Sequence, residues 1–238
     1  MKGNFKTVYQ AATAEIIEKK SRFIGAAAPV DTEGAAADFV DSIRKAHPRA
    51  NHNCFAYIGG DAPHWQKQSD DGEPSGTAGM PMFEILRGEG LLNVCVVVTR
   101  YFGGTLLGKG GLHRAYSAAA KAALLEAGIV EKIVHARLEI RLDYHLAGKM
   151  AHELATGGYH TENTDYAENV AITILTPPEK IPEINRMVAD ATSGTGKIIH
   201  IKDLHCVILG EGGAYAHKNP GFSAGAGDIG KRKYICYD

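Results

Sequence analysis

The segment Val94–Tyr101 reads VCVVVTRY, and it is the strongest secondary-structure signal in the first half of the chain. Successive side chains of a β-strand point to opposite faces, so Val96, Val97 and Val98 make both faces of this segment apolar. A strand that is apolar on both faces is covered on both sides. The stretch therefore predicts a buried strand at the centre of a sheet.

Weaker patterns around this segment predict the rest of the same domain. Strands are expected at 13–19, 21–27 and 54–58. A helix is expected at 34–47, where Ala37, Val40 and Ile43 recur at a spacing of three, and another at about 80–86. An Ala-rich amphipathic helix at 112–127 is stopped by Gly128. These elements indicate an α/β sandwich over residues 1–134.

A second pattern follows, with its boundary near residues 132–137. It predicts a strand at 138–143, a helix at 145–156, strands at 159–165 and 169–175, a helix at 181–191 and a strand at 197–201. The order β-α-β-β-α-β is the split βαβ plan of a ferredoxin-like domain, here assigned to 135–203. The predicted fold class is α+β, with two α/β sandwich domains.

Residues 204–238 differ in composition and are predicted to be a Gly-rich carboxy-terminal extension. Seven glycines fall between Gly210 and Gly230, and three consecutive basic residues follow. A strand at 234–237 is the alternative for its last part.

Charge and cysteine usage limit the classes of partner. Lys and Arg total 26 against 27 Asp and Glu, so the net charge of −1 gives no bulk attraction to nucleic acid or anionic lipid. Any nucleic-acid surface must then be a local patch.

The most apolar stretch, 91–98, is far shorter than the roughly 20 residues that span a bilayer. Four scattered cysteines without a C-x-x-C pair favour a reducing cytoplasm over a disulfide framework or a zinc site.

Ten of the 28 glycines fall between Gly72 and Gly111, which indicates unusual backbone geometry in this region. Its first part, the acidic loop 69–79, contains Asp70, Asp71, Glu73 and Ser75. Two interpretations remain open for these carboxylates: ligands of a divalent cation, or the more frequent Asx-type turn that caps the next helix. His52 and Cys54 nearby are half of a metal site, a reactive Cys–His pair, or ordinary packing residues on one face of a strand.

The second part of the region is basic. No acidic residue occurs between Gly90 and Leu125, whereas Arg100, Lys109, Arg114 and Lys121 supply four positive charges. Free backbone N–H groups at the start of the following helix would attract an anion such as a phosphate. The candidate nucleic-acid or anion-binding residues are Arg100, Tyr101, Phe102, Gly103, Gly104, Lys109, Gly110, Gly111 and Arg114. We expect Arg100 to pair with Asp70, Asp71 or Glu73 and so to order the acidic loop.

Two long motifs in this region resemble those of the YigZ/IMPACT family in its bacterial two-domain form. They are DDGEPSGTAG at 70–79 and VVTRYFGGTLLGKGGLHRAY at 97–116, and HNCFAY at 52–57 and SRFI at 21–24 are also similar. The resemblance is strong over residues 5–132. It implies a first domain similar to domain IV of elongation factor G and a ferredoxin-like domain similar to its domain V.

The resemblance also implies a functional class. Eukaryotic relatives regulate translation by competing for the activator of an initiation-factor kinase, but they use an additional domain that is not apparent here. For the bacterial branch the fold likeness implies RNA or ribosome contact, without established catalytic residues.

Three functional hypotheses follow. The leading one is a cytoplasmic RNA- or ribosome-associated regulator of translation, with Arg100, Lys109 and Arg114 on phosphates and Tyr101 or Phe102 stacked on a base. The second is an enzyme that acts on a small phosphorylated or carboxylated metabolite, with a carboxylate of the acidic loop as metal ligand or general base. The third is a protein-interaction module that uses the same surface. No catalytic residue, cofactor or resident metal is assigned.

Overall fold

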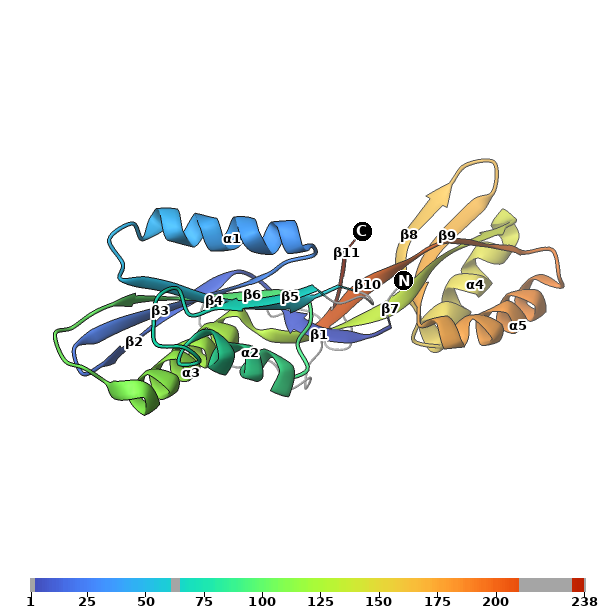
Figure 1. Cartoon of the computed structure of the whole chain (residues 1–238). Helices are drawn as coiled ribbons and strands as arrows, with labels where there is room; N and C mark the ends of the chain where they lie inside the picture. Colours follow the sequence, from blue (N-terminus) through green and yellow to red (C-terminus); the bar gives the residue numbers. More distant parts are fainter. Residues whose placement is uncertain (1–2, 61–64, 210–232, 238) are drawn as a thin grey trace. The chain divides into compact units, whose positions relative to one another are not determined.

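The computed structural model describes residues 3–60, 65–209 and 233–237, which fall into two compact units (Figure 1). The amino-terminal unit contains residues 5–131, and the carboxy-terminal unit contains residues 132–209 together with 3–4 and 233–237. The division lies between Glu131 and Lys132, next to the boundary region that the sequence predicts. No helix in the described residues is long and apolar enough to cross a membrane.

The amino-terminal unit is built on an antiparallel five-stranded sheet of order β2-β3-β6-β4-β5. Its strands are β2 (Ala12–Glu18), β3 (Ser21–Pro29), β4 (His52–Gly59), β5 (Trp65–Ser69) and β6 (Val94–Tyr101). β5 and the short first strand, β1 (Phe5–Val8), are not predicted from the sequence. β6 lies at the centre of the sheet and is buried from Val94 to Arg100, which confirms the prediction from its valine run.

Helices cover both faces of this sheet (Figure 1). α1 (Glu33–Ala46) covers one face, and α2 (Gly79–Gly88) and α3 (Gly108–Ala127) cover the other. Val97 of β6 packs in the core under α1, whereas Val96 and Val98 pack in the core against α2 and α3. The alternating side chains of one strand therefore contribute to both cores.

One glycine allows α3 to approach the sheet closely. A Cβ atom at Gly25 of β3 would lie 2.4 Å from the backbone oxygen of Ala119 in α3. Both residues are buried, so neither backbone has free space in which to retreat. The contact sets the distance between helix and sheet on this side of the unit.

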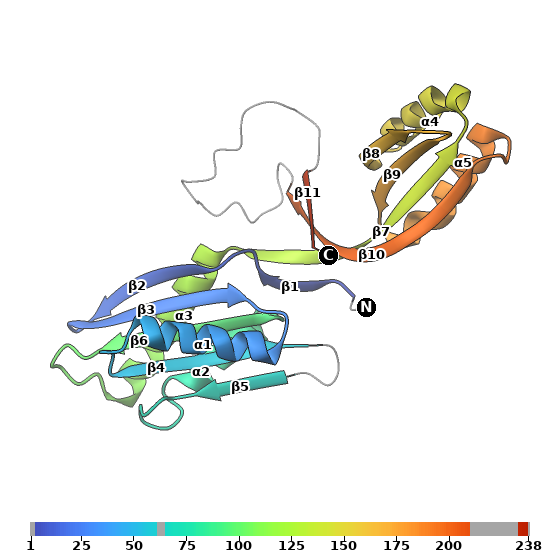
Figure 2. The same ribbon diagram turned by 90° about the horizontal axis from the view of Figure 1, so that it is seen from above.

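The carboxy-terminal unit has the predicted ferredoxin-like order. Its elements are β7 (Ile129–Leu142), α4 (Tyr144–Thr156), β8 (His160–Tyr166), β9 (Val170–Thr176), η1 (Pro178–Lys180), α5 (Ile181–Thr192) and β10 (Lys197–Leu209). The strands pair antiparallel in the order β10-β7-β9-β8. Both helices contribute to the core on one face of this sheet, which includes Leu138, Ile140, Met150, Ile172 and Ile184 (Figure 2).

Several expectations need correction in this unit. β7 begins at Ile129 rather than at the predicted residue 138, and β10 continues to Leu209, beyond the predicted domain end at residue 203. β11 (Lys233–Tyr237) pairs with β10, which confirms the alternative of a strand at 234–237, so this part of the predicted extension belongs to the sheet. Cys206 and Cys236 are opposite each other in that register and form a disulfide, so the expectation of free cysteines is wrong for this pair. Predictions for residues 210–232 lie outside the described residues.

The contact at Gly25 generates a stability prediction. Gly25→Ala should lower the free energy of unfolding by about 1–3 kcal/mol, because the new methyl group overlaps a backbone oxygen that cannot move alone. Gly34→Ala in the first turn of α1 is the control, since its nearest neighbouring atom is 3.8 Å away. The better helix propensity of alanine should leave stability unchanged or raise it by up to about 1 kcal/mol. Thermal unfolding followed by circular dichroism measures both, and equal effects would contradict the close-packing argument.

Candidate functional site

Asp70 is the structural cap of the acidic loop. Its carboxylate accepts the backbone N–H groups of Gly76 (2.8 Å), Ala78 (3.0 Å) and Gly79 (2.8 Å), where α2 begins. Partial burial alone would raise the pKa of Asp70, but the three N–H donors outweigh it and lower the pKa below its ordinary value. Asp70 therefore caps the start of α2, as the helix-capping interpretation of the acidic loop expects.

Asp71 connects the loop to α1 and β4. Its carboxylate lies 3.2 Å from Arg44 Nη2 and accepts the backbone N–H of Asn53 at 2.7 Å. Its carbonyl accepts a hydrogen bond from His52 Nδ1 at 2.8 Å. Asp70 and Asp71 thus both hold the loop in place, and no group of three or more His, Cys, Asp or Glu side chains in the described part of the chain could hold a metal ion.

Glu73 and Arg100 form a buried ion pair at the centre of this region. Their side chains are 3% and 7% exposed, and Arg100 Nη1 lies 2.6 Å from Glu73 Oε1. The same oxygen accepts the hydroxyl of Tyr116 at 2.8 Å, and His52 Nε2 lies 3.9 Å away. The predicted pairing of Arg100 with the acidic loop is confirmed. It joins the loop, β6 and α3.

Arg100 does not lie on the surface, as a phosphate contact would require. Its guanidinium carbon lies 5.4 Å from the ring centre of Phe23 and 5.5 Å from that of Phe102. Its Nε is buried and has no hydrogen-bond partner among the described residues. Arg100 is paired and enclosed by aromatic rings, so its predicted role as a direct phosphate contact needs correction.

Cys54 and Tyr116 are also buried beside this ion pair. The Cys54 thiol donates to the carbonyl of Asp70 at 2.9 Å, and burial raises the pKa values of both Cys54 and Tyr116. A thiol kept protonated in this way is a poor nucleophile. The reactive interpretation of Cys54 is not supported, and the packing interpretation accounts for its position.

Gly103 brings the β2–β3 turn beside the loop 102–107. A Cβ atom at Gly103 would lie 2.0 Å from the backbone carbon of Lys20, and the N–H of Gly103 donates to Ser21 Oγ at 3.1 Å. Lys19 and Lys20 are exposed at this turn. Both ribbon views show the turn and the loop at the same end of the unit (Figures 1 and 2).

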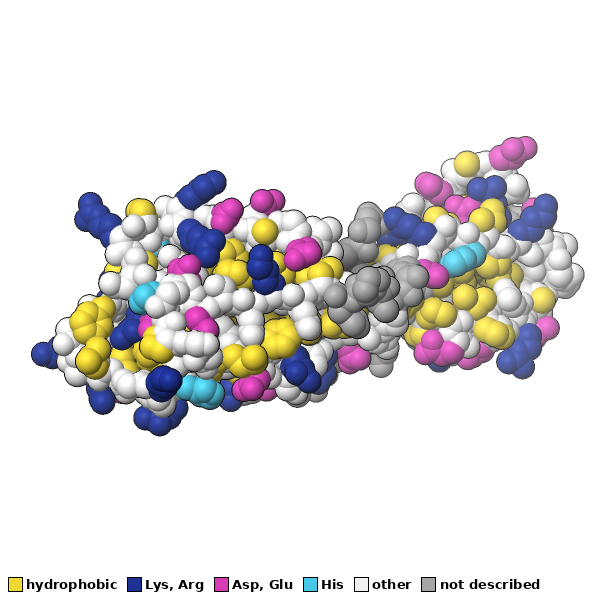
Figure 3. Space-filling model, viewed as in Figure 1, with side chains coloured by type: hydrophobic (Ala, Val, Ile, Leu, Met, Phe, Trp, Pro, Cys, Tyr) yellow, Lys and Arg dark blue, Asp and Glu magenta, His cyan; other side chains and the backbone are white. Residues whose placement is uncertain are grey.

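The exposed cations Lys19, Lys20, Lys109 and Arg114 at this end, with Phe102 among them, form what we term the basic tip. Phe102 is 46% exposed and Leu106 is 82% exposed. Glu18 is an acidic residue of the same hairpin and partly offsets the charge. In the space-filling view, basic and apolar side chains lie together at this end (Figure 3).

The other predicted residues have different surroundings. Tyr101 is half-buried, with its hydroxyl 3.0 Å from His47 Nδ1 and Arg22 over its ring, so Phe102 is the more exposed of the two aromatic side chains. α3 begins at Gly108, so Gly110 and Gly111 lie in its first turn rather than before it. Gly104 has a φ of +82°, as suits a turn, and Ser75 is exposed.

Lys19 and Lys20 are not among the site residues predicted from the sequence. The available signal was a Lys-Lys pair between two strand-like segments, the usual place for a hairpin turn. Nothing in that local pattern indicated that the turn would lie against Gly103.

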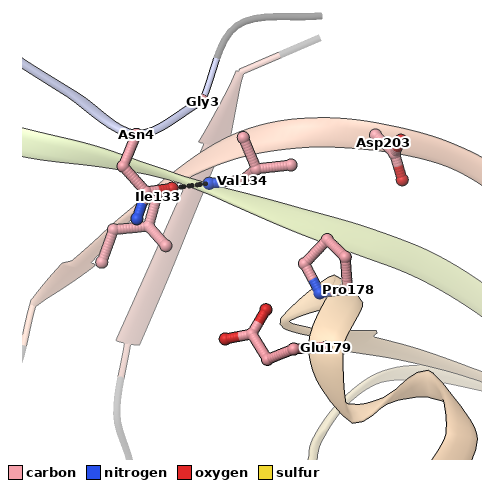
Figure 4. Close-up of a pocket in the computed structure, with 7 residues that line it drawn as sticks. All are labelled: Gly3, Asn4, Ile133, Val134, Pro178, Glu179 and Asp203. Carbon is pink, nitrogen blue, oxygen red and sulfur yellow. Dashed lines mark hydrogen bonds between the residues drawn. The ribbon is translucent and has the colours of Figure 1, made fainter.

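Two hollows in the described parts of the chain are lined by other residues. One, of about 310 Å³, is lined by residues of the carboxy-terminal unit that include Asn4, Val134, Glu179 and Asp203 (Figure 4). Asn4 Oδ1 accepts the N–H of Val134 at 3.0 Å at its edge. The other, of about 380 Å³, is lined by residues of α2 and α3. Neither is lined by a residue of the acidic loop.

The chain is 40% identical over 195 residues to "IMPACT family member YvyE" of Bacillus subtilis, an alignment that covers 82% of this chain and 90% of that protein. The chain belongs to the IMPACT family. Its similarity to "IMPACT family member YigZ" of Escherichia coli is 37% identity over 198 residues, covering 81% of this chain and 97% of that protein.

Two family models match separate parts of this IMPACT-family chain. The Impact N-terminal domain matches residues 19–124, and a domain of unknown function, DUF1949, matches 140–195. A crystal structure described as that of a hypothetical protein is 33% identical, covers 85% of this chain and 99% of its own, and has a TM-score of 0.54. The acidic loop and the basic tip both lie within the Impact N-terminal domain match.

The buried ion pair generates a stability prediction. Glu73→Gln removes the negative charge beside Arg100 and should lower the free energy of unfolding by about 3 kcal/mol, because a buried cation loses its counterion. Urea unfolding measures the change. Glu15→Gln, which breaks the exposed pair with Arg22, is the matched control and should leave the urea midpoint unchanged. Similar midpoints for both variants would show that the buried pair contributes no more than the exposed one.

The lowered pKa of Asp70 generates a pH prediction. A carboxyl whose pKa is lower in the folded state stabilises the fold above its unfolded pKa, near 3.8, and loses this contribution as pH falls through the folded value. Asp70→Asn should therefore be less stable than the wild type at neutral pH, and the difference should shrink below about pH 4. Urea midpoints measured from neutral pH to about pH 3 test this. Asp38→Asn, at an exposed site on α1, should instead give a curve parallel to the wild type.

Proposed function

We propose that this IMPACT-family chain binds single-stranded RNA through the basic tip, as an RNA- or ribosome-associated regulator of translation. The observation that best supports this proposal is the close contact of Gly103 with Lys20 and Ser21. It brings two exposed lysines next to a segment without acidic residues. A local cluster of cations thereby forms on a chain whose net charge is −1.

The composition of the basic tip suits contact with a nucleic-acid backbone. Long cationic side chains neutralise phosphates without reading sequence, and they set affinity and orientation. The first turn of α3 adds backbone N–H groups that no side chain caps. Arg114 Nη1 would lie 3.7 Å from a Cβ atom at Gly110, so this cation reaches back over the same turn.

Phe102 adds a base-stacking surface to these charges. Its N–H donates to Asn51 Oδ1 at 2.8 Å, and the buried Arg100 lies against one side of its ring. An exposed aromatic ring that is fixed in this way can stack on an unpaired base. Arg100 supports RNA binding in this proposal by positioning Phe102 rather than by touching phosphate.

The enzyme hypothesis has weaker support from the same contacts. Asp70 is engaged by three N–H donors, Asp71 by Arg44 and Asn53, and Glu73 by Arg100 and Tyr116. Carboxylates with these partners already hold the loop in place.

The ribosome is named in the proposal because the two domains resemble domains IV and V of elongation factor G.

RNA binding should depend on salt in proportion to the cations in contact. For a labelled oligouridylate, log affinity should fall with log salt at a slope of about −0.7 per contacted phosphate, or roughly −2.8 for the four cations. Lys109→Ala with Arg114→Ala should flatten the slope by about 1.4 and leave the melting temperature unchanged. Lys19→Ala with Lys20→Ala should do the same. Lys45→Ala with Lys67→Ala removes two exposed cations elsewhere in the unit and is the control.

Phe102→Ala separates stacking from charge. It should weaken binding by about 1–3 kcal/mol and leave the salt slope unchanged, because no phosphate contact is lost. If the double alanine variant at Lys109 and Arg114 weakens RNA binding no more than the double alanine variant at Lys45 and Lys67, RNA binding through the basic tip is contradicted.

A further inference from the structure

Two exposed tyrosines lie together in the carboxy-terminal unit, away from the elements used above. Tyr144 is the first residue of α4 and Tyr166 is the last residue of β8. They are 54% and 66% exposed, and their ring centres are 6.2 Å apart with planes inclined by 36°. Two neighbouring aromatic rings with this exposure are unusual on a surface without a partner, since tyrosine is enriched at binding interfaces.

The backbone and a side-chain hydrogen bond hold the two rings in position. The Tyr144 hydroxyl donates to the carbonyl of Ala167 at 2.5 Å, which ties the start of α4 to the β8–β9 turn. Tyr166 is opposite Val170 in the antiparallel register of that hairpin. A ligand would therefore meet a largely preformed surface, and little side-chain entropy would be lost on binding.

Carboxylates flank the tyrosines. Asp143 directly precedes Tyr144, and Glu168 lies in the β8–β9 turn; both are exposed, and neither forms an ion pair within the part of the chain that the structure describes. The space-filling view has acidic side chains at the tip of this hairpin (Figure 3). We term Asp143, Tyr144, Tyr166 and Glu168 the tyrosine patch.

The nearest cation along β7 does not neutralise the tyrosine patch. Arg141 is opposite Ala171 of β9. The adjacent pair along these two strands, Leu142 and Val170, packs in the core under the helices. Successive side chains alternate between faces, so Arg141 lies on the other face of the sheet from Tyr166, which is opposite Val170. Arg141 is also paired with Glu139 at 2.5 Å.

We propose that the tyrosine patch binds an arginine-rich peptide segment of a partner protein. The faces of tyrosine rings attract a guanidinium group, and arginine also stacks on them as a plane. The two carboxylates would accept charge-assisted hydrogen bonds from the same or a neighbouring arginine. The proposal does not depend on RNA binding by the basic tip.

Charge favours a cationic peptide over other occupants. The phosphates of a nucleic acid would meet the two carboxylates of the tyrosine patch, which repel them. A second copy of the tyrosine patch would bring like charges together, which disfavours symmetric self-association. Arginine should bind more tightly than lysine, because only its planar group can stack between or over the rings.

The test uses the full-length chain and fluorescein-labelled hexaarginine, followed by fluorescence anisotropy, with hexalysine and a neutral Gly-Ser hexapeptide for comparison. We expect hexaarginine to bind more tightly than hexalysine and the neutral peptide not to bind. Tyr166→Leu should weaken hexaarginine binding roughly five-fold, whereas Tyr166→Phe, which keeps a ring, should bind like the wild type. Asp143→Asn with Glu168→Gln should weaken binding by at least about five-fold. Asp190→Asn, at an exposed carboxylate on α5, is the control and should have no effect.

Three results would overturn the proposal. The first is unchanged hexaarginine binding by Tyr166→Leu and by the double carboxylate variant, each shown to be folded by its circular dichroism spectrum. The second is perturbation of the tyrosine ring resonances by oligouridylate but not by hexaarginine, which would make the surface a nucleic-acid platform. The third is self-association of the free chain that is lost on Tyr166→Leu, which would identify a second copy as the occupant.

Discussion

The buried ion pair between Glu73 and Arg100 is the constraint on which the amino-terminal unit depends most. Two charges with side chains 3% and 7% exposed are tolerated only because each is the partner of the other. Glu73 reaches the pair from the acidic loop, Arg100 from the central strand, and the Tyr116 hydroxyl from α3. Moving the acidic loop or the central strand would leave a buried charge without its partner, so the pair fixes where the acidic loop lies.

The same pair links a buried core to an exposed surface. Arg100 lies against the inner side of Phe102, whose ring is half open to solvent, and Asn51 fixes the backbone of that residue. A surface aromatic ring is useful for recognition when its orientation is set by the core behind it. The buried residues around Glu73 thus hold the exposed ring of Phe102 in its orientation.

The two units present surfaces of opposite chemical character. In the Impact N-terminal domain, cations from a hairpin turn and from the first turns of α3 surround one exposed phenylalanine. In the carboxy-terminal unit, two carboxylates flank a pair of tyrosines. The net charge of −1 for the whole chain conceals this separation, because a sum over all charged residues does not record where they lie.

The sequence by itself determined the central position of β6, the ferredoxin-like order of the second unit and the pairing of Arg100 with the acidic loop. These features follow from valine runs, helical spacing and charge content, which are local properties of the sequence. Which carboxylate pairs with Arg100, and that the pair is buried, was decided by packing across 27 residues. The place of Lys19 and Lys20 beside Gly103, and the Cys206–Cys236 disulfide, were decided by contacts across 82 and 30 residues. Such contacts depend on how strands and helices pack in three dimensions, and no local periodicity encodes them.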